Sequence, residues 1–132
     1  DIQNVRRRAA RDREEGVRFA EERLLLDFVS VLDDLDRAVA AMSPEQASES
    51  YAQGVVLTAQ RMRDLLARHG VTPIDAQGKP FDPTFHEAIL EIDAPAGVEA
   101  GAVVQVVQTG YRRGERALRA SHVVVARART DA

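Results

Sequence analysis

The most informative segment of the sequence is GYRRGERALRASHVVVAR, residues 110–127. Two apolar segments, Val103–Val107 before it and Val123–Ala126 inside it, flank a basic region that contains two glycines. Apolar segments joined through glycine-containing turns predict short antiparallel strands. From Arg112 to Arg129 there are six arginines and one acidic residue, a local charge of +5. Such a basic sheet edge suits either solubility or the binding of a partner.

Residues 71–132 predict a small β domain, because short apolar runs recur between turns that contain proline or glycine. The strands that we expect cover residues 71–74, 88–92, 103–109, 111–113, 116–118 and 123–127. The alternation over 88–93 predicts a half-buried strand whose inward side chains are Ala88, Leu90 and Ile92. The result is a compact, mostly antiparallel β unit near the lower size limit for independent folding.

Residues 2–42 predict one long helix, because this stretch contains no proline and a single glycine, Gly16. Apolar residues recur along it in steps of three and four, at Val17, Ala20, Leu24, Phe28, Val31, Leu35, Ala38 and Met42. A second row joins this first row after Leu24, through Leu25, Val29, Leu32 and Val39. The helix would be about 60 Å long, which is more than a small domain can bury. A narrow stripe suits one partner helix and a broad stripe suits several, so we predict a self-paired rod that leads into a helical bundle.

Ser43-Pro44-Glu45-Gln46 predicts a turn followed by a new helix, with serine as N-cap, proline in the first helical position and glutamine three residues after the cap. A shorter apolar stripe follows, and Gly70 is a typical helix stop. Two chains with two helices each would make a four-helix bundle. The predicted domains are a long dimerising helix over 1–42, a second bundle helix over 43–70 and a C-terminal β domain over 71–132.

Composition excludes several classes of protein. Hydrophobic residues make up 45% and charged residues 30%, which is typical of a folded chain. The absence of cysteine excludes disulfides and thiolate metal sites. A net charge of −3 disfavours a general nucleic-acid binder. Since no apolar run approaches a transmembrane length and no signal peptide is recognisable, we expect a cytoplasmic location. The chain begins at Asp1 in helical register and without methionine, so we expect a fragment of a longer protein.

No arrangement of side chains predicts catalysis. His69, His86 and His122 lack the spacing of a zinc-protease motif. A Gly-x-Ser-x-Gly elbow, a cysteine nucleophile and a phosphate-binding loop are all missing from the sequence. We therefore predict a binding protein that is not an enzyme and that needs no metal or cofactor.

The chain resembles the GrpE family, the nucleotide exchange factors of DnaK-type heat-shock chaperones. The resemblance covers nearly the whole chain, and its motifs follow one another in the family's order. They are Val5-Arg6-Arg7-Arg8, Phe19, Val31–Ala38, Gly54, Met62, Phe81-Asp82-Pro83, His86-Glu87-Ala88, Gly110-Tyr111, Arg116–Arg119 and Val123–Arg127. Each motif is weak alone, but the set in this order is highly specific.

The resemblance implies a parallel homodimer with paired long helices, a four-helix bundle and one β domain on each chain. The residues expected at the dimer interface are Val17, Leu24, Phe28, Val31 and Leu35. Family members use one β domain as a wedge that opens the nucleotide cleft of the chaperone's ATPase domain, so that ADP leaves and ATP binds. This implies a co-chaperone of the heat-shock response that takes part in protein folding. Asp12 and Gly16 interrupt the apolar stripe in the first part of the long helix. We therefore also expect the N-terminal rod to melt before the β domain, so that heat reduces exchange activity.

The resemblance also implies which residues meet the chaperone. The expected contacts are Phe81, Val107, Val125 and Arg116 in the β domain, and Arg6 and Arg7 on the long helix. Val107 and Val125 could equally be strand core. Gly54 matches a bundle glycine whose enlargement should disturb the side that faces the chaperone. Gly110, Tyr111 and His86 are expected to be structural.

Two other functions fit the same sequence. The first is a dimeric coiled-coil adaptor whose basic β domain holds a different acidic protein. The second is a nucleic-acid-binding dimer that uses Arg6–Arg13 and Arg112–Arg119. Residues 1–23 hold seven arginines against six acidic residues, which favours a solvated helix face with ion pairs over a nucleic-acid site.

Overall fold

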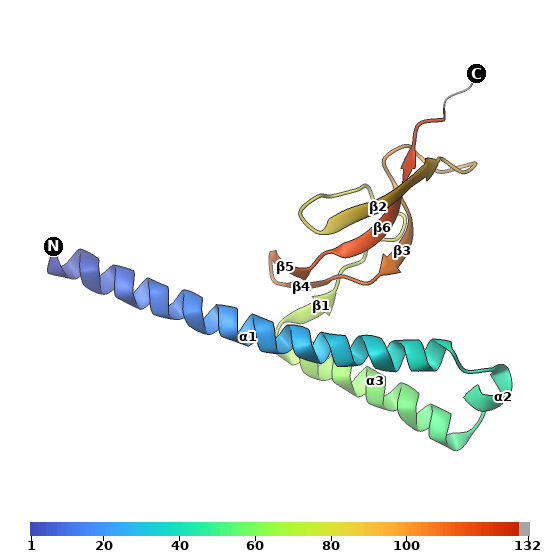
Figure 1. Ribbon diagram of the computed structural model, residues 1–132, viewed down its shortest axis with the longest axis horizontal. Coiled ribbons are helices and arrows are strands. Elements are labelled where there is room, and N and C mark those ends of the chain that lie inside the picture. The colour runs from blue at the N-terminus through green and yellow to red at the C-terminus, as the bar shows by residue number, and fades with distance from the viewer. Residues whose placement is uncertain (130–132) are drawn as a thin grey trace. The chain divides into compact units, whose positions relative to one another are not determined.

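The computed structural model describes residues 1–129, which divide into two compact units. Unit 1 is residues 1–64 and unit 2 begins at Leu65. The helices, labelled in Figure 1, are α1 (Ile2–Ala40), α2 (Pro44–Ala47) and α3 (Ser50–Arg68). The strands are β1 (Val71–Pro73), β2 (His86–Asp93), β3 (Val103–Gln108), β4 (Tyr111–Arg113), β5 (Arg116–Arg119) and β6 (Ser121–Arg127). Helices followed by strands make this an α+β protein, as predicted.

The helix α1 is continuous over 39 residues and is capped by Asp1, whose carboxylate accepts a backbone hydrogen bond at 3.1 Å. It ends at Ala40, slightly before the predicted end at Met42. The end of α1 is set by the residues that follow it, because Ser43 caps the next helix. Ser43 Oγ accepts a hydrogen bond from the Gln46 N–H at 3.1 Å, and Gln46 Oε1 accepts one from the Ser43 N–H at 3.0 Å. This reciprocal pair confirms the predicted turn and restart.

The two apolar rows of α1 differ in burial. Leu25, Val29 and Leu32 of the second row are buried. The first row remains exposed in the single chain at Val17, Leu24, Phe28 and Val31, and is half-buried at Leu35. Residues 1–21 are exposed all round. The second row is therefore used for packing within the chain, whereas the first row is left on the surface.

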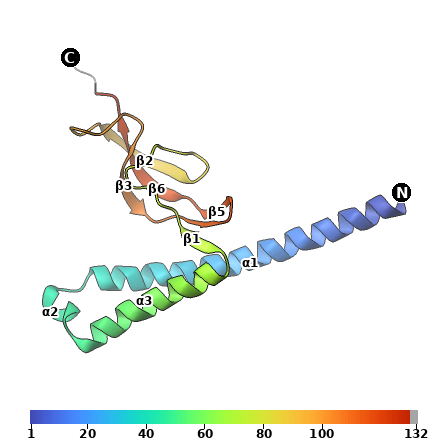
Figure 2. The ribbon, with the colours of Figure 1, turned by 180° about the vertical axis from the view of Figure 1, so that it is seen from behind.

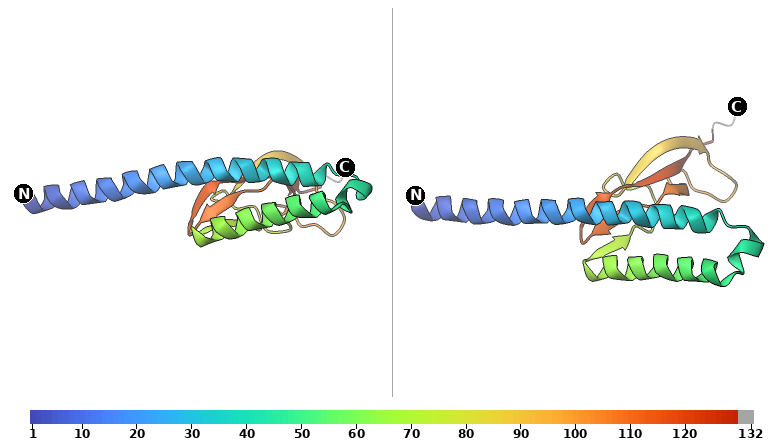
Figure 3. Two further views of the ribbon diagram at one scale, coloured as in Figure 1. Left: turned by 90° about the horizontal axis from the view of Figure 1, so that it is seen from below. Right: turned by 60° about the horizontal axis from the view of Figure 1, so that its bottom comes forward.

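The first part of α3 runs antiparallel to the second half of α1, and the two lie side by side (Figures 1 and 3). Ala52 and Ala59 are buried on one face of α3. The guanidinium of Arg63 donates to the carboxylate of Asp36 and links the two helices. The helix ends just before Gly70, whose φ of 80° lies in the left-handed region that favours glycine. This confirms the predicted stop.

Unit 2 contains two three-stranded sheets, with the orders β1-β4-β5 and β2-β6-β3 (Figures 1 and 2). The pair β2–β6 is parallel and the other three pairs are antiparallel, which confirms the mostly antiparallel prediction. The central strand β6 is buried continuously over residues 123–126. The core of the unit consists of Ile74, Ala76, Val103, Val123 and Val125, with Phe81, Phe85 and Val106 packed against it.

The strand β2 differs from its prediction. Ala88, Ile89 and Leu90 are all exposed, and only Ile92 of the expected inward residues is half-buried. β2 lies at the edge of its sheet, and its register with β6 shifts between Ala88 and Leu90. Such a shift breaks the two-residue period of a strand, so the inward orientation predicted for Ala88 and Leu90 is wrong. The ends of the other strands lie within two residues of their predicted positions.

Candidate partner-binding site

The two sheets of unit 2 join at Gly110. Its N–H donates to Ser121 Oγ at 2.8 Å, and its carbonyl accepts a hydrogen bond from the Ile74 N–H at 2.9 Å. A Cβ atom on residue 110 would lie 2.3 Å from the Ser121 nitrogen and 2.6 Å from the Arg119 carbonyl oxygen. Its φ is not in the left-handed region, so the close approach of two backbone segments is what requires glycine here. The structural expectation for Gly110 thereby gains a physical reason.

Ser121 is fully buried at this junction and was missed by the sequence analysis. It accepts the Gly110 N–H through its side chain and donates its own N–H to the Phe85 carbonyl at 2.9 Å. The only signal for it in the sequence is a small polar residue at the start of an apolar strand. Its partner lies 11 residues earlier, and no local pattern predicts that pairing.

His86 and Tyr111 lie in the packed interior of unit 2. His86 is buried, its Nδ1 accepts the Asp82 N–H at 3.0 Å, and its ring lies 5.9 Å from the Phe81 ring. Tyr111 is also buried, and the Arg119 guanidinium lies over its ring at 5.4 Å. These surroundings support the structural roles predicted for both residues.

The arginines of residues 112–119 mostly stack on rings or donate hydrogen bonds within unit 2. Arg112 lies over the Phe85 ring at 4.4 Å and donates through Nε to the Gly114 carbonyl at 2.9 Å. Arg113 donates through Nε to the His69 carbonyl at 3.2 Å. Guanidinium groups that stack and donate in this way hold the sheet and its turn in place, which lowers their availability to an outside partner.

The predicted contact residues of unit 2 lie in different surroundings. Val107 is 55% exposed, because it follows Val106, which packs against the core from the opposite face of β3. Arg116 is exposed at the start of β5, and Phe81 is half-buried beside the core. Val125 is only 8% exposed and belongs to the core, which is the strand-core alternative that the sequence left open for this residue. The reason is that residues 123–126 of β6 are buried without interruption, so the side chains on both faces of this strand are covered.

The predicted contacts and the glycine of unit 1 lie on helix surfaces. Arg6 and Arg7 are exposed on the first part of α1. Gly54 is exposed on α3, and a Cβ there would meet no atom within 4 Å in the single chain. The surroundings of Gly54 within the described chain therefore give no steric reason for glycine.

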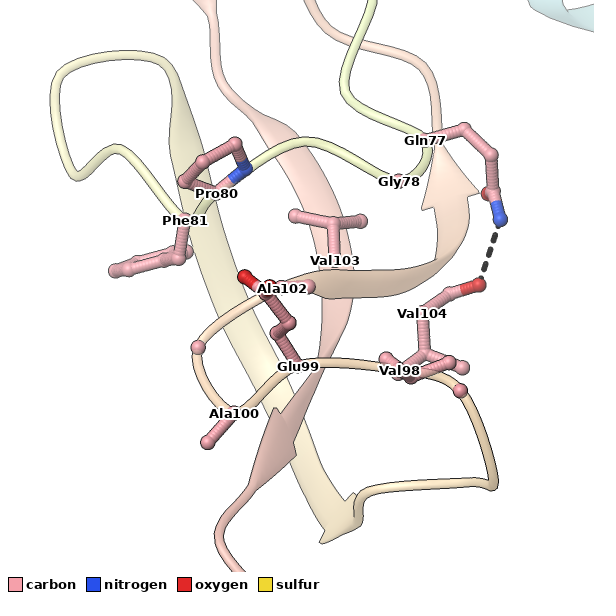
Figure 4. Close-up of a pocket in the computed structure, with 12 residues that line it drawn as sticks. Gln77, Gly78, Pro80, Phe81, Val98, Glu99, Ala100, Ala102, Val103 and Val104 are labelled. Carbon is pink, nitrogen blue, oxygen red and sulfur yellow. Dashed lines mark hydrogen bonds between the residues drawn. The ribbon is translucent and has the colours of Figure 1, made fainter.

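An open groove of about 630 Å³ lies between residues 77–81 and 97–104. Three backbone hydrogen bonds join these segments, from the Phe81 N–H to the Gly101 carbonyl at 2.9 Å, from the Gly78 N–H to the Val103 carbonyl at 3.0 Å and from the Val103 N–H to the Lys79 carbonyl at 2.8 Å. Figure 4 shows the side chains that line it, which are mostly apolar and include Phe81. A concave apolar surface of this volume is within the range that binds ligand or partner side chains.

Two polar side-chain contacts among the described residues join β2 and β6. The Glu87 carboxylate lies 3.3 Å from His122 Nε2, and Asp93 accepts from Arg127 Nε at 2.8 Å. The hydrogen bond and the negative charge of Asp93 raise the pKa of Arg127 above its ordinary value. Arginine is already ionised at physiological pH, so this pair adds no pH dependence there.

Comparison with known proteins decides the family. A model of the GrpE family matches residues 1–127, which includes nearly all of both units. The chain belongs to the GrpE family. Protein GrpE of Latilactobacillus sakei is 38% identical over 126 residues, which cover 96% of this chain and 63% of that protein. Protein GrpE of Stutzerimonas stutzeri is 38% identical over 133 residues, which cover 100% of this chain and 70% of that protein. Protein GrpE of Mesorhizobium japonicum is 41% identical over 133 residues, which cover 96% of this chain and 63% of that protein.

The family assignment confirms the resemblance found in the sequence. The chain spans 63 to 70% of the length of these three GrpE relatives. Among the described residues no group of three or more acidic or histidine side chains is arranged to hold a metal ion. None of the described helices is long and apolar enough to cross a lipid bilayer.

Proposed function

We propose that this chain is a non-enzymatic nucleotide exchange factor, a co-chaperone that accelerates ADP release from a DnaK-type chaperone. The observation that carries the proposal is the match of residues 1–127 to the GrpE family, which spans both the helices and the β unit. The exposed Val107 and Arg116 of the β unit are suited to contact the chaperone's ATPase domain. Arg6 and Arg7 on α1 supply a second, basic contact surface.

The proposed mechanism is a population shift in the chaperone. The β unit binds the open form of the nucleotide cleft better than the closed form, and this difference in affinity moves the equilibrium toward opening. Driving the cleft from mostly closed to mostly open requires on the order of 5.5 kcal/mol of differential affinity. Because the coupling is reciprocal, ATP binding weakens the affinity of the chaperone for the exchange factor.

We further propose a parallel homodimer in which α1 pairs with α1 and the α1–α3 hairpins of two chains form a four-helix bundle. The support is the first apolar row of α1, which remains exposed in the single chain at Val17, Leu24, Phe28 and Val31. α3 also exposes large apolar side chains, at Tyr51, Val56, Leu57 and Leu65. Apolar surface of this extent is typical of a protein–protein interface.

The proposed function is tested by the release of a fluorescent ADP analogue from the cognate chaperone. We expect saturating amounts of this chain to accelerate release strongly, and excess ATP to dissociate the complex. An unchanged release rate at saturation would contradict the exchange-factor proposal. Binding of the chain to an unrelated acidic protein would favour the adaptor, and salt-sensitive DNA binding at micromolar affinity would favour the nucleic-acid binder.

The substitution Val107→Asp tests the contact on β3. We expect the affinity for the ATPase domain to fall about tenfold or more, because an exposed valine loses its apolar contact and a carboxylate is desolvated instead. The free energy of unfolding should change by less than about 1 kcal/mol, since residue 107 lies on the surface. Calorimetric titration and thermal unfolding measure the two quantities. Ile89→Asp on β2 is the matched control, because Ile89 is 49% exposed. Equal losses of affinity in both variants would contradict a specific contact at Val107.

The substitution Gly16→Ala tests whether heat acts through the first part of α1. Nothing lies within 4 Å of a Cβ at this position, so alanine fits and stabilises the helix by about 1 kcal/mol per chain. We expect an early helical transition in far-UV circular dichroism to move up by roughly 5 °C, and the loss of exchange activity on heating to move with it. Ala9→Gly, also exposed on α1, should shift both downward. A single transition shared by the helical signal and by probes of the β unit would contradict separate melting.

A further inference from the structure

The groove between residues 77–81 and 97–104 has an unusual distribution of charge. Its lining is apolar apart from two side chains, Gln77 and Glu99. Gln77 is already engaged, because its Nε2 donates to the Val104 carbonyl at 2.7 Å, as Figure 4 shows. Glu99 is exposed and, among the described residues, is the only ionisable one that lines the groove. Within residues 1–129 no ion pair or hydrogen bond engages its carboxylate.

The Glu99 carboxylate is directed along the groove toward Phe81. In Figure 4 the Glu99 side chain extends past Ala102 to the side that Pro80 and Phe81 line. The backbone confirms that these segments are neighbours, because Pro80 and Ala102 form a β-bridge and the Phe81 N–H donates to the Gly101 carbonyl at 2.9 Å. The groove therefore combines an aromatic ring, small apolar residues and one carboxylate.

The aromatic residues of unit 2 show a repeated pattern. Phe85 and Tyr111 each carry an arginine of the same chain over the ring, Arg112 at 4.4 Å and Arg119 at 5.4 Å. Phe81 contacts the His86 ring, and no arginine or lysine of residues 1–129 lies over it. An aromatic ring that borders a groove with a free carboxylate suits a cation, which the ring quadrupole and the carboxylate both attract.

We propose that this groove receives one arginine or lysine side chain from the chaperone's ATPase domain. The aliphatic stem of that side chain lies along Phe81 and Pro80, and its cationic group binds the Glu99 carboxylate. This inference rests on the proposed exchange function and names the chemistry by which the β unit recognises its partner. It adds Glu99, which the sequence did not single out, to the contact surface.

The choice of a basic side chain follows from the cost of the alternatives. A purely apolar side chain in the groove would remove water from Glu99 without replacing it, and an unpaired carboxylate is expensive to desolvate. An acidic side chain would meet the like charge of Glu99 directly. A basic side chain satisfies the carboxylate with a charge-assisted hydrogen bond and also covers the apolar lining with its stem.

Binding of the isolated ATPase domain to three variants of the chain tests the inference. We expect Glu99→Gln to weaken binding about tenfold and Glu99→Lys about a hundredfold, and we expect the salt dependence of the affinity to decrease in both. Glu49→Lys is the matched control for charge, because Glu49 is exposed in unit 1 and outside every contact surface named here. It should bind within about twofold of the unsubstituted chain. Since Glu99 is exposed on a loop, all three variants should keep the amide spectrum of the folded protein.

A small-molecule probe tests the groove without the chaperone. N-acetyl-arginine-methylamide, titrated into the nitrogen-15-labelled chain, should shift the amide signals of Phe81, Glu99 and Ala102 at millimolar concentration. The citrulline analogue has nearly the same shape without the charge and should shift them much less. The Glu99→Lys variant should lose the response to the arginine probe.

The outcomes separate this inference from the exchange-factor proposal. Normal exchange with an unchanged affinity for Glu99→Lys would overturn the inference and leave the exchange function intact. Equal shifts from the arginine and citrulline probes would also overturn it. If the arginine probe binds but the ATPase domain does not, the preference of the groove for a cation stands, and its assignment to the chaperone falls with the exchange-factor proposal.

Discussion

Replacing Gly110 with alanine is expected to lower the free energy of unfolding of unit 2 by about 3 kcal/mol or more. The added Cβ would lie 2.3 Å from the Ser121 nitrogen and 2.6 Å from both Ser121 Oγ and the Arg119 carbonyl oxygen. Two of these atoms belong to the backbone, so no flexible side chain can move aside to relieve the overlap. The strands β4 and β5 must separate from β3 and β6 at the junction, and the hydrogen bond between the Gly110 N–H and Ser121 Oγ is lost with them.

Thermal and urea unfolding of Gly110→Ala, followed by near-UV dichroism or amide spectra, measures this effect. The matched control is Thr109→Ala, because the neighbouring threonine side chain is exposed and its removal should change stability by less than about 0.5 kcal/mol. Ser121→Ala should show an intermediate loss of about 1–3 kcal/mol, since it leaves the buried Gly110 N–H without its acceptor. A Gly110→Ala variant as stable as Thr109→Ala would mean that the junction relaxes at little cost.

Replacing Phe28 with aspartate is expected to make the chain monomeric at micromolar concentration. Phe28 belongs to the exposed apolar row of α1, and in a symmetric dimer each substitution removes two such side chains. Burial of one large apolar side chain contributes about 1.5–3 kcal/mol, so the pair accounts for roughly 4 kcal/mol and a thousandfold in the dissociation constant. Two carboxylates placed at the interface weaken it further.

Sedimentation velocity over a concentration series measures the oligomeric state, and far-UV dichroism measures the helix. Helical content should fall together with dimerisation, because residues 1–21 are exposed all round in the single chain and an isolated helix of that length is marginal. Ser30→Asp is the matched control, since Ser30 is exposed on α1 outside the apolar row. A Phe28→Asp chain that sediments as a dimer would contradict the proposed interface.

The helical half of the protein was largely predictable because its signals are local. The reciprocal hydrogen bonds of Ser43 and Gln46 involve residues three apart, and the left-handed Gly70 follows directly from the end of α3. Both depend on backbone geometry within one turn, which residue types alone specify. The two apolar rows of α1 were also visible as a periodic pattern. Which row is buried and which is exposed was not visible in the pattern, because it depends on where α3 lies against α1.

Burial in unit 2 was harder to predict, because it depends on how the strands pair and pack. Residues 123–126 of β6 are buried on both faces of the strand, so Val125 belongs to the core rather than to the surface. β2 lies at an edge and carries a register shift, so its alternating pattern does not translate into alternating burial. Whether a strand is central or at an edge depends on pairing between residues distant in sequence. No window of a few residues contains that information.

Residue types and the order of motifs were enough to predict the family, the long helix, the turn at Ser43 and the mostly antiparallel β unit, because each rests on local residue types or on motifs in order. Three features became visible only in the folded chain: Arg112 stacks on a ring of its own unit, Ser121 hydrogen-bonds to Gly110, and Glu99 lines an open apolar groove. These features arise where segments distant along the chain meet. Contacts, burial and a carboxylate without an ion-pair partner among the described residues are properties of the folded chain. They give this chain its candidate surface for a partner.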